Sequence, residues 1–416
     1  QQKNTGLYFY DLNLKTNYRI SDKHRLYLSG YFGRDVFSFN NNIGFSWGNY
    51  TLTLRWNHLI NKKLFSNRSF IYSNYDYEFN VNPGSRNVDI TSRIEDINYK
   101  EDYHFYLNPG NTIKFGYNVM YHTFHPGEIK LTDDAASSDI LMQKKYAFET
   151  GIFAMNEQKI SDNLIVSYGL RHSSFTDVGP GNDYTYNEEG MVTDTVQYSK
   201  SDIIKSYNGL EPRLSVNVIM NDKASVKVGY ARNYQYMHLL QKSTSASPAD
   251  LWVPSSSYVE PQISDQISVG YYRNFKENSY ISSVEVYYKS LQNQIEYRNG
   301  ADLMMNELIE SQLVFGKGRA YGAEFQIEKT KGDFTGWISY TLSKSERSFD
   351  AIKNGDWFPA TQDRTHDLSV VGMYKLSDRI TLSGTWVFYT GNAVTFPSGK
   401  YQYQVFTVNY YTERNG

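Results

Sequence analysis

The stretch Asn221-Asp222-Lys223-Ala224-Ser225-Val226-Lys227-Val228-Gly229-Tyr230-Ala231 contains both features that decide the fold. It begins with a tight polar turn and continues as a run in which apolar and polar or small side chains alternate. A period of two places successive side chains on opposite faces of a strand, whereas a helix repeats every 3.6 residues. The stretch therefore predicts a β-strand with one apolar face and one polar face.

The same motif recurs along the whole chain. Asn, Asp, Ser and Gly, which tight turns prefer, gather roughly every 40–60 residues. These turns cover residues 21–24, 61–63, 108–111, 161–163, 221–223, 276–278, 331–333 and 377–379. Several alternating runs between them reach ten residues or more. A globular strand is usually ~5–6 residues long, whereas a strand that crosses a membrane needs ~9–11. The strand lengths therefore favour membrane-spanning strands.

The connections on the opposite side of these strands are longer and polar. They cover residues 125–143, 178–207, 237–262, 296–316, 347–365 and 397–416. Short turns at one rim and long loops at the other are typical of outer-membrane barrels, with the short turns facing the periplasm. Backbone groups cannot remain unpaired in hydrocarbon, so such strands must close into a barrel. We expect an all-β fold, a transmembrane antiparallel β-barrel, with about sixteen strands in residues 1–416.

Composition agrees with this class and excludes others. The mean hydropathy is −0.58, and no stretch approaches the ~18 apolar residues of a transmembrane helix. Aromatic residues nevertheless make up 16% of the chain, with 38 Tyr, which argues against disorder. The absence of cysteine removes disulfides and thiolate metal sites. A formal net charge of −2 gives no reason to expect a nucleic-acid partner.

The energetic cost of a charge in lipid sets the register of the strands. An Arg or Lys that faces lipid at the middle of the membrane costs ~2–4 kcal/mol. A shift of one residue would move every charge on one face into the lipid. We therefore expect the following charged side chains to face the lumen: Arg55, Arg171, Lys227, Glu285, Glu324 and Glu328.

Several runs resemble one known family. The run Asn208-Gly209-Leu210-Glu211-Pro212-Arg213-Leu214-Ser215 resembles a strand start of TonB-dependent outer-membrane receptors. More specific are residues 238–240 (HLL), 248–254 (PADLWVP), 315–322 (FGKGRAYG), 362–367 (QDRTHD), 389–393 (YTGNA) and 409–416 (NYYTERNG). Together they resemble receptors of the Bacteroidota type, in the subgroup with a carboxypeptidase-regulatory-like domain. The resemblance covers nearly the whole chain.

The resemblance implies a barrel of 22 strands with a plugged lumen. Residues 1–416 then hold a barrel incomplete at both ends, without the plug, the TonB box or any N-terminal β-sandwich domain. It also implies an active transporter in the Gram-negative outer membrane that takes up a siderophore, cobalamin, glycan or peptide with energy from TonB. Two alternatives stay open: a structural or assembly subunit of an outer-membrane complex, and a passive porin-like channel. The ligand itself is not indicated by the sequence.

Ligand contacts are expected in the long loops. Aromatic and imidazole side chains at the barrel mouth would suit stacking on a ligand, and these are Tyr236, His238, Trp252, Trp357 and Phe358. The alternative is that they pack the loops onto a plug or onto one another. Partners expected from the family are TonB, outer-membrane lipids with lipopolysaccharide, and a SusD-like surface lipoprotein.

No motif predicts catalysis, a metal or a cofactor. His122, His125, Asp133 and Asp134 come close together in sequence, but exposed polar loops often collect such residues. Gly316-Lys317-Gly318 leads into a predicted strand, and a phosphate-binding loop needs a helix there. The serines of residues 243–247 have no partner base at a fixed spacing. We therefore expect no enzyme activity.

Overall fold

The computed structural model describes residues 5–40, 42–82, 86–133, 137–187, 189–240, 251–298, 301, 306, 308–396, 399–403 and 406–410. Asp134, residues 243–247 and residues 411–416 lie outside these ranges, so the interpretations placed on them are untested. An 18-stranded antiparallel sheet dominates the fold. Two of its strands, β7 (Ser137–Leu141) and β20 (Phe358–Pro359), are short additions to longer neighbours.

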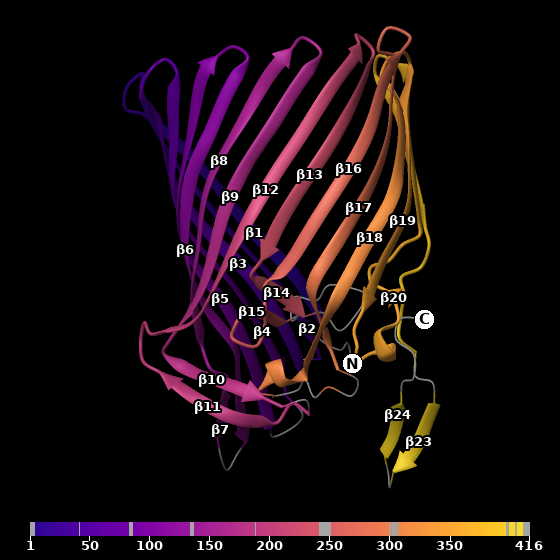
Figure 1. The fold of residues 1–416 in the computed structure, drawn as a ribbon. Coiled ribbons are helices and arrows are strands. Elements are labelled where there is room, and N and C mark those ends of the chain that lie inside the picture. The colour runs from indigo at the N-terminus through magenta and orange to yellow at the C-terminus, as the bar shows by residue number, and fades with distance from the viewer. Residues whose placement is uncertain are drawn as a thin grey trace.

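The remaining strands of the sheet follow one another as a meander, each antiparallel to the next (Figure 1). The first eight are β1 (Thr5–Arg19), β2 (His24–Phe39), β3 (Ile43–Leu59), β4 (Leu64–Val81), β5 (Arg86–Asn108), β6 (Asn111–Asp133), β8 (Lys145–Ser161) and β9 (Leu164–Val178). The second eight are β12 (Ile203–Asn221), β13 (Ala224–Gln235), β16 (Gln262–Phe275), β17 (Tyr280–Tyr297), β18 (Leu313–Lys329), β19 (Phe334–Ser348), β21 (His366–Ser377) and β22 (Ile380–Tyr389). The prediction of about sixteen long strands is confirmed.

All eight predicted short turns join consecutive strands, and they gather at one rim of the sheet (Figure 1). The opposite rim carries the long connections and their small hairpins. These hairpins are β10 (Gly181–Tyr186) with β11 (Val192–Tyr198), β14 (Met237–Leu240) with β15 (Leu251–Pro254), and β23 (Gly399–Tyr403) with β24 (Phe406–Tyr410). Two connections at this rim are short, because only residues 40–42 and 82–85 separate the flanking strands.

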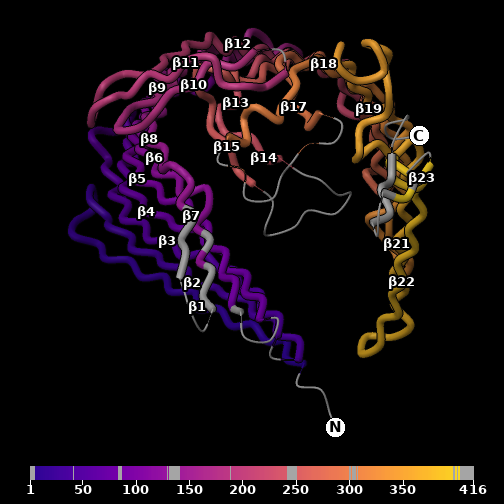
Figure 2. The backbone as a smooth tube through the Cα atoms, turned by 90° about the horizontal axis from the view of Figure 1, so that it is seen from below, coloured from indigo at the N-terminus to yellow at the C-terminus, as the bar shows by residue number. Residues whose placement is uncertain are grey.

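The sheet is strongly curved and open on one side (Figure 2). Its two edges are β1 and β22, and within the described residues each pairs with a single neighbour, β2 and β21 respectively. The β14–β15 hairpin lies on the inner side of the curve (Figure 2). Two short 3-10 helices, η1 (Ile309–Gln312) and η2 (Lys353–Gly355), occur in the connections at the loop rim. No helix in the described ranges has the length and apolarity to cross a membrane.

The two faces of the sheet differ as the alternation predicts. On β17 the apolar side chains Val284, Val286 and Tyr288 are exposed on the outer face. On the inner face, the Lys227 ammonium lies 4.7 Å from the centre of the Tyr272 ring. The hydroxyl of Tyr272 donates to the Glu285 carboxylate at 2.8 Å. Acidic and basic groups therefore share the inner face, and the predicted register holds there.

Charged pairs also lie on the outer face, which the sequence did not predict, and one of them joins β4 and β5. Arg68 of β4 shares its face with the half-exposed Phe70 and forms an ion pair with Glu101 of β5. The Glu101 carboxylate also accepts hydrogen bonds from the hydroxyls of Tyr103 at 2.5 Å, Tyr99 at 3.0 Å and Tyr117 at 3.2 Å. The Arg68 guanidinium lies 4.7 Å from the centre of the Trp56 ring. This enclosure compensates for the loss of hydration at a lipid-facing position.

Candidate functional site

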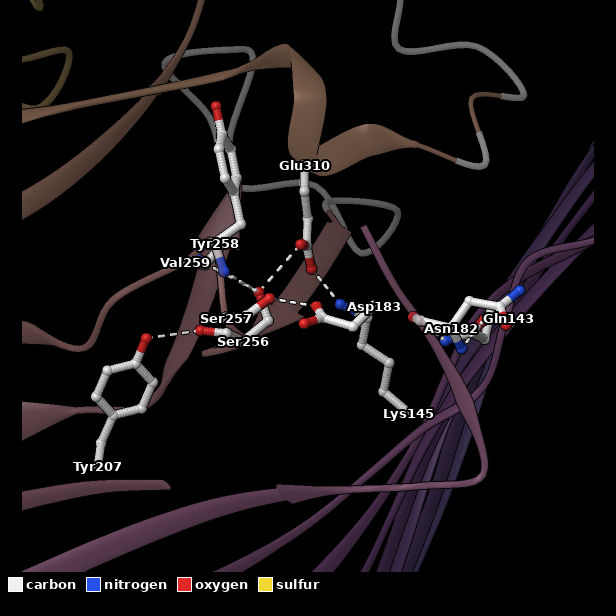
Figure 3. A network of polar contacts seen from close by, with 10 residues as sticks. All are labelled: Gln143, Lys145, Asn182, Asp183, Tyr207, Ser256, Ser257, Tyr258, Val259 and Glu310. Atoms are coloured by element: carbon white, nitrogen blue, oxygen red, sulfur yellow. Dashed lines mark hydrogen bonds and ion pairs between the residues drawn. The ribbon is translucent and has the colours of Figure 1, made fainter. Parts of the chain in front are cut away.

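The loop rim contains a buried polar network centred on Glu310 of η1 (Figure 3). The ammonium of Lys145, the first residue of β8, forms an ion pair with one oxygen of this carboxylate. The hydroxyl of Ser256 donates to the other oxygen at 3.0 Å. Glu310 is 9% exposed. Because these residues are far apart in sequence, the contacts fix two separate loops against the loop-rim end of the wall.

The network continues into a third loop and into the wall. The hydroxyl of Ser257 donates to Asp183 of β10, and the hydroxyl of Tyr207 of β12 donates to the Ser256 carbonyl at 2.7 Å. The backbone N–H of Val259 donates to the Ser256 hydroxyl at 3.1 Å. We call Lys145, Asp183, Ser256, Ser257 and Glu310 the loop node.

A pair of amides extends the attachment of the β10–β11 hairpin. The side-chain N–H of Gln143 donates to the backbone carbonyl of Asn182 at 2.9 Å. In return, the backbone N–H of Asn182 donates to the side-chain oxygen Oε1 of Gln143 at 2.8 Å. Figure 3 shows both residues as labelled sticks. Reciprocal hydrogen bonds of this kind leave neither amide unpaired in a partly buried position. The hairpin is therefore held at two places, to the β7–β8 connection through Gln143 and to the β15–β16 connection through Ser257.

Negative charge exceeds positive charge around the loop node. Asp177, Asp183 and Glu310 all lie near the Lys145 ammonium and favour its charged form. Burial and the nearby Glu310 raise the pKa of Tyr186 in β10 above its ordinary value, so its hydroxyl stays protonated. A small cavity adjoins the node and is lined by Asp177, Trp252, Tyr184 and Tyr186, among others. The arrangement offers carboxylates and aromatic rings side by side.

Two of the five predicted ligand contacts lie next to each other in the wall and the inner hairpin. Tyr236 is 3% exposed, and its hydroxyl lies 2.8 Å from that of Ser173. Its ring stacks on Phe175 with 5.3 Å between the ring centres. His238 of β14 is 1% exposed, and its Nε2 lies 2.9 Å from the Ser255 hydroxyl. Burial lowers the pKa of His238 to about 4, so the imidazole is neutral at neutral pH.

Trp252 lies in the same hairpin as His238, where it pairs with Leu239, whereas the consecutive residues Trp357 and Phe358 lie in the β19–β21 connection. Trp252 of β15 lines the cavity beside the loop node. Phe358 is buried against Phe349 and Ile352 in a small core beneath the β19–β21 connection. Trp357 is 36% exposed and lies against Arg319. The five residues thus fall into two groups, Tyr236, His238 and Trp252 at the inner hairpin and Trp357 and Phe358 in the β19–β21 connection. Their role as ligand contacts stays a prediction.

His122 was grouped in the sequence analysis with His125, Asp133 and Asp134, but its carboxylate partners in the structure are Asp96 and Glu149. His122 is fully buried on the inner wall, where its Nδ1 lies 2.7 Å from Asp96 of β5 and its Nε2 3.7 Å from Glu149 of β8. Across the described residues, no group of three or more His, Cys, Asp or Glu side chains is placed to hold a metal ion. Gly316 and Gly318 lie inside β18, as predicted, and not at the start of a helix.

The inner wall itself offers a concave surface on which charged, aromatic and apolar side chains are mixed. A concave region of about 680 Å³ is lined by side chains of β8, β9, β12 and β13, including Arg171, Glu211 and Arg213. Glu211 lies 3.6 Å from both Arg171 and Arg213, and Arg171 donates to Asn118 at 3.0 Å. Such a surface fits water, polar ligands or another polar protein surface. It does not select one sign of charge.

Sequence reasoning missed the loop node entirely. Lys145 and Glu310 are 165 positions apart, and neither belongs to a spaced motif. Ser256 and Ser257 stand in a polar stretch whose composition predicts only a loop. No signal in a single sequence connects these residues. Only the strand order brings their loops to the same part of the rim.

The fold and its inner wall define a large antiparallel outer-membrane barrel. The family model described as "TonB dependent receptor-like, beta-barrel" matches residues 1–415, and the chain belongs to this family. A search of curated proteins finds no match. The family and the solved structures below are outer-membrane β-barrel proteins that act as receptors or transporters.

Solved structures share the fold at low sequence identity. The ferric-catecholate import receptor Fiu of Escherichia coli K12 is 12% identical, with a TM-score of 0.61 over 92% of this chain and 71% of that chain. The ferric citrate transporter FecA is 13% identical, with a TM-score of 0.67 over 94% and 59%. The hemophore receptor HasR of Serratia marcescens, solved with its hemophore HasA and heme, is 13% identical, with a TM-score of 0.62 over 92% and 64%. This chain thus spans about three fifths to seven tenths of their lengths.

Proposed function

We propose that this chain is the barrel portion of an active transporter in the Gram-negative outer membrane that takes up a scarce nutrient. The observation that carries the proposal is the inner wall, where Arg171, Glu211 and Arg213 line a wide concavity together with apolar and aromatic side chains. Membership of the TonB-dependent receptor family supports it further. The substrate would bind at the loops and at a plug, and TonB would transmit the energy that opens a path. The proposal assigns the plug and the TonB contact to chain outside residues 1–416.

The substrate class remains broad in this proposal: a siderophore, cobalamin, a glycan or a peptide. Carboxylates and aromatic rings around the cavity at Trp252 suit a ligand with polar groups and flat apolar surfaces. We also propose the Bacteroidota type and the subgroup with a carboxypeptidase-regulatory-like domain. The proposed partners are TonB and a SusD-like or other surface lipoprotein. HasR, solved in complex with its hemophore, supports a protein partner for a barrel of this fold.

A second candidate function is a structural or assembly subunit of an outer-membrane complex. The loop node favours it, because Glu310 and Ser256 hold separate loops together through buried contacts. Loops that these contacts keep in one arrangement would suit a scaffold. A receptor, in contrast, needs loops that rearrange around a ligand.

Growth of a deletion strain separates the two candidates. The strain would be compared with wild type on defined sources of iron, cobalamin, peptide and glycan, each at limiting concentration. Transport predicts a growth defect on one source, restored by the full-length gene and not by a gene whose TonB-contacting segment is deleted. Normal growth on every source, together with loss of an outer-membrane complex on native gels, would instead support the scaffold.

A further inference from the structure

The cavity beside the loop node lies beyond the lipid belt, toward the loop rim. Asp177, one of its lining residues, follows Leu164 at the start of β9 by thirteen positions. At ~3.3 Å per residue and a tilt of ~45°, these positions span about 43 Å along the strand and about 30 Å along the barrel axis. The apolar band of an outer-membrane barrel is ~25 Å tall. Groups at the height of Asp177 therefore meet water and external ligands, not lipid.

Asp177 is buried without a side-chain partner. It is 5% exposed, and its carboxylate accepts a backbone hydrogen bond from Val178. Among the described residues it has no ion pair and no hydrogen bond to a side chain. Burial raises the pKa of Asp177 to about 7, with Glu310 and Asp183 acting in the same direction and the Lys145 ammonium against it. A buried carboxylate is costly unless a cation compensates for its lost hydration, so this site lacks a cation.

Three lysines lie around Asp177, and none of them forms an ion pair with it in the described part of the chain. Lys145 forms its ion pair with another carboxylate of the loop node (Figure 3). Lys205 pairs with Asp177 in the backbone register of β9 and β12, but its side chain is exposed and its ammonium lies 5.4 Å from the centre of the Tyr207 ring. Lys144 also lines the cavity and is exposed. A further cation is thus needed to pair with Asp177.

The lining of the cavity indicates which kind of cation fits. Trp252, Tyr184 and Tyr186 line it together with Asp177 and Asp183. Aromatic faces attract ammonium groups, and carboxylates accept hydrogen bonds from them. The carboxylates of the described residues are not grouped closely enough to hold a metal ion. The cavity measures about 60 Å³, whereas ~10–15 Å³ holds one water, so it admits the aminomethyl end of a ligand but not a whole siderophore.

We propose that this cavity binds a primary ammonium group of the transported ligand, with Asp177 as its carboxylate partner and Trp252 as its aromatic contact. The inference rests on the proposed transport function, and it narrows the substrate class to a nutrient that carries a primary amine. Such an amine occurs in peptides and in amino sugars. A ligand bound there would also adjoin the loops that contribute Lys145, Asp183 and Glu310.

The test uses the purified full-length protein in detergent micelles and isothermal titration calorimetry. The probes are Nα-acetyl-lysinamide, diglycine amide and glucosamine, each compared with the form in which its amine is acetylated, and calcium chloride. The test variant is Asp177→Asn, which keeps the shape of the side chain and removes an uncompensated buried charge, so that folding is preserved. The control variant is Asp194→Asn, which removes an exposed carboxylate of β11 at the same rim. Heat-modifiable mobility in electrophoresis establishes that each variant is folded.

We expect the unaltered protein to bind at least one of the amines and none of the acetylated forms. Asp177→Asn should weaken amine binding at least about tenfold, while Asp194→Asn leaves it unchanged. Trp252→Leu should weaken it about threefold. Binding of the lysine or dipeptide probe would identify the source of the amine as a peptide, and binding of glucosamine would identify it as an amino sugar.

The pH dependence gives a second readout. The amine of Nα-acetyl-lysinamide stays charged between pH 6 and pH 8. Asp177 loses its proton over this range because its pKa is about 7. Affinity for this probe should therefore rise about tenfold from pH 6 to pH 8 in the unaltered protein and stay constant in Asp177→Asn.

Equal affinity for the amines and their acetylated forms would overturn the inference, as would equal affinity of Asp177→Asn and Asp194→Asn. Binding of calcium in place of every amine, or of none of the probes by the folded protein, would also overturn it. The calorimetry needs no TonB, so its outcome is separate from that of the transport function. A protein that binds amines without importing them would contradict transport, whereas import of a nutrient by a protein that binds no amine would contradict only the ammonium site.

Discussion

Val228 offers the sharpest test of the assigned faces, through the variant Val228→Arg. Val228 is 38% exposed on the outer face of β13 and pairs with Val216 on one side and Val269 on the other. It lies midway between the turn residue Lys223 and the loop-side residue Arg232. An Arg at the middle of the bilayer costs ~2–4 kcal/mol. At ~1.4 kcal/mol per tenfold, the folding equilibrium should fall by about 30-fold to 700-fold.

The matched control is Ala231→Arg, which introduces the same guanidinium on the inner face of the same strand. A second control, Lys227→Ala, removes an inner cation that lies over the Tyr272 ring, a contact that contributes about 0.5–1 kcal/mol. Folding into lipid vesicles would be measured as a function of urea, with heat-modifiable mobility as the readout. We expect a large loss for Val228→Arg alone. Equal losses for Val228→Arg and Ala231→Arg would refute the register.

Three further predictions concern charged or buried groups. Glu101→Gln leaves the Arg68 guanidinium uncompensated on the outer face and should cost about 3–5 kcal/mol in the same urea assay. The double variant with Arg68→Met should recover most of that loss, and failure to recover would contradict the enclosed-pair interpretation. The pKa of His238 is about 4 in the fold against an ordinary 6.5. The unfolded segment therefore binds a proton first as the pH falls, and about 3 kcal/mol of stability present above pH 6.5 is lost between pH 6.5 and pH 4. Hydrogen exchange at the β14–β15 hairpin should quicken over that window, and a His238→Asn variant should show no such dependence. Glu310→Gln removes the ion pair with Lys145 and should speed amide exchange of residues 256–259 by about tenfold; unchanged exchange would show that the loop node does not hold these loops.

The strands and their faces follow from the sequence because local rules act on them. A turn such as residues 221–223 is set by neighbouring side chains, and the alternation around Val228 reports which face meets lipid. These rules extend over ten residues or fewer, so eight turns and sixteen long strands were accessible without structural information.

The contacts within the loops do not follow from such rules. The pairing of Lys145 with Glu310 depends on which loops the strand order brings together. His238 and Phe358 were assigned to ligand contacts because they are aromatic residues in long loops, yet their burial depends on how those loops fold back. The outer pair of Arg68 and Glu101 contradicts the rule that charge avoids lipid, and only the surrounding tyrosines explain it. Single-sequence patterns do not report these three-dimensional neighbours.

Uptake of a radiolabelled nutrient, the one identified by the growth experiment, tests the central claim most directly. It would be measured in cells that carry the full-length protein, with and without functional TonB, and with and without a protonophore. The account predicts that the label still binds to the cell surface in all cases, while its entry requires both TonB and the proton-motive force. Entry that continues without either would contradict active transport and support a passive channel. Absence of entry and binding, with a folded barrel present in the outer membrane, would contradict a transport role altogether.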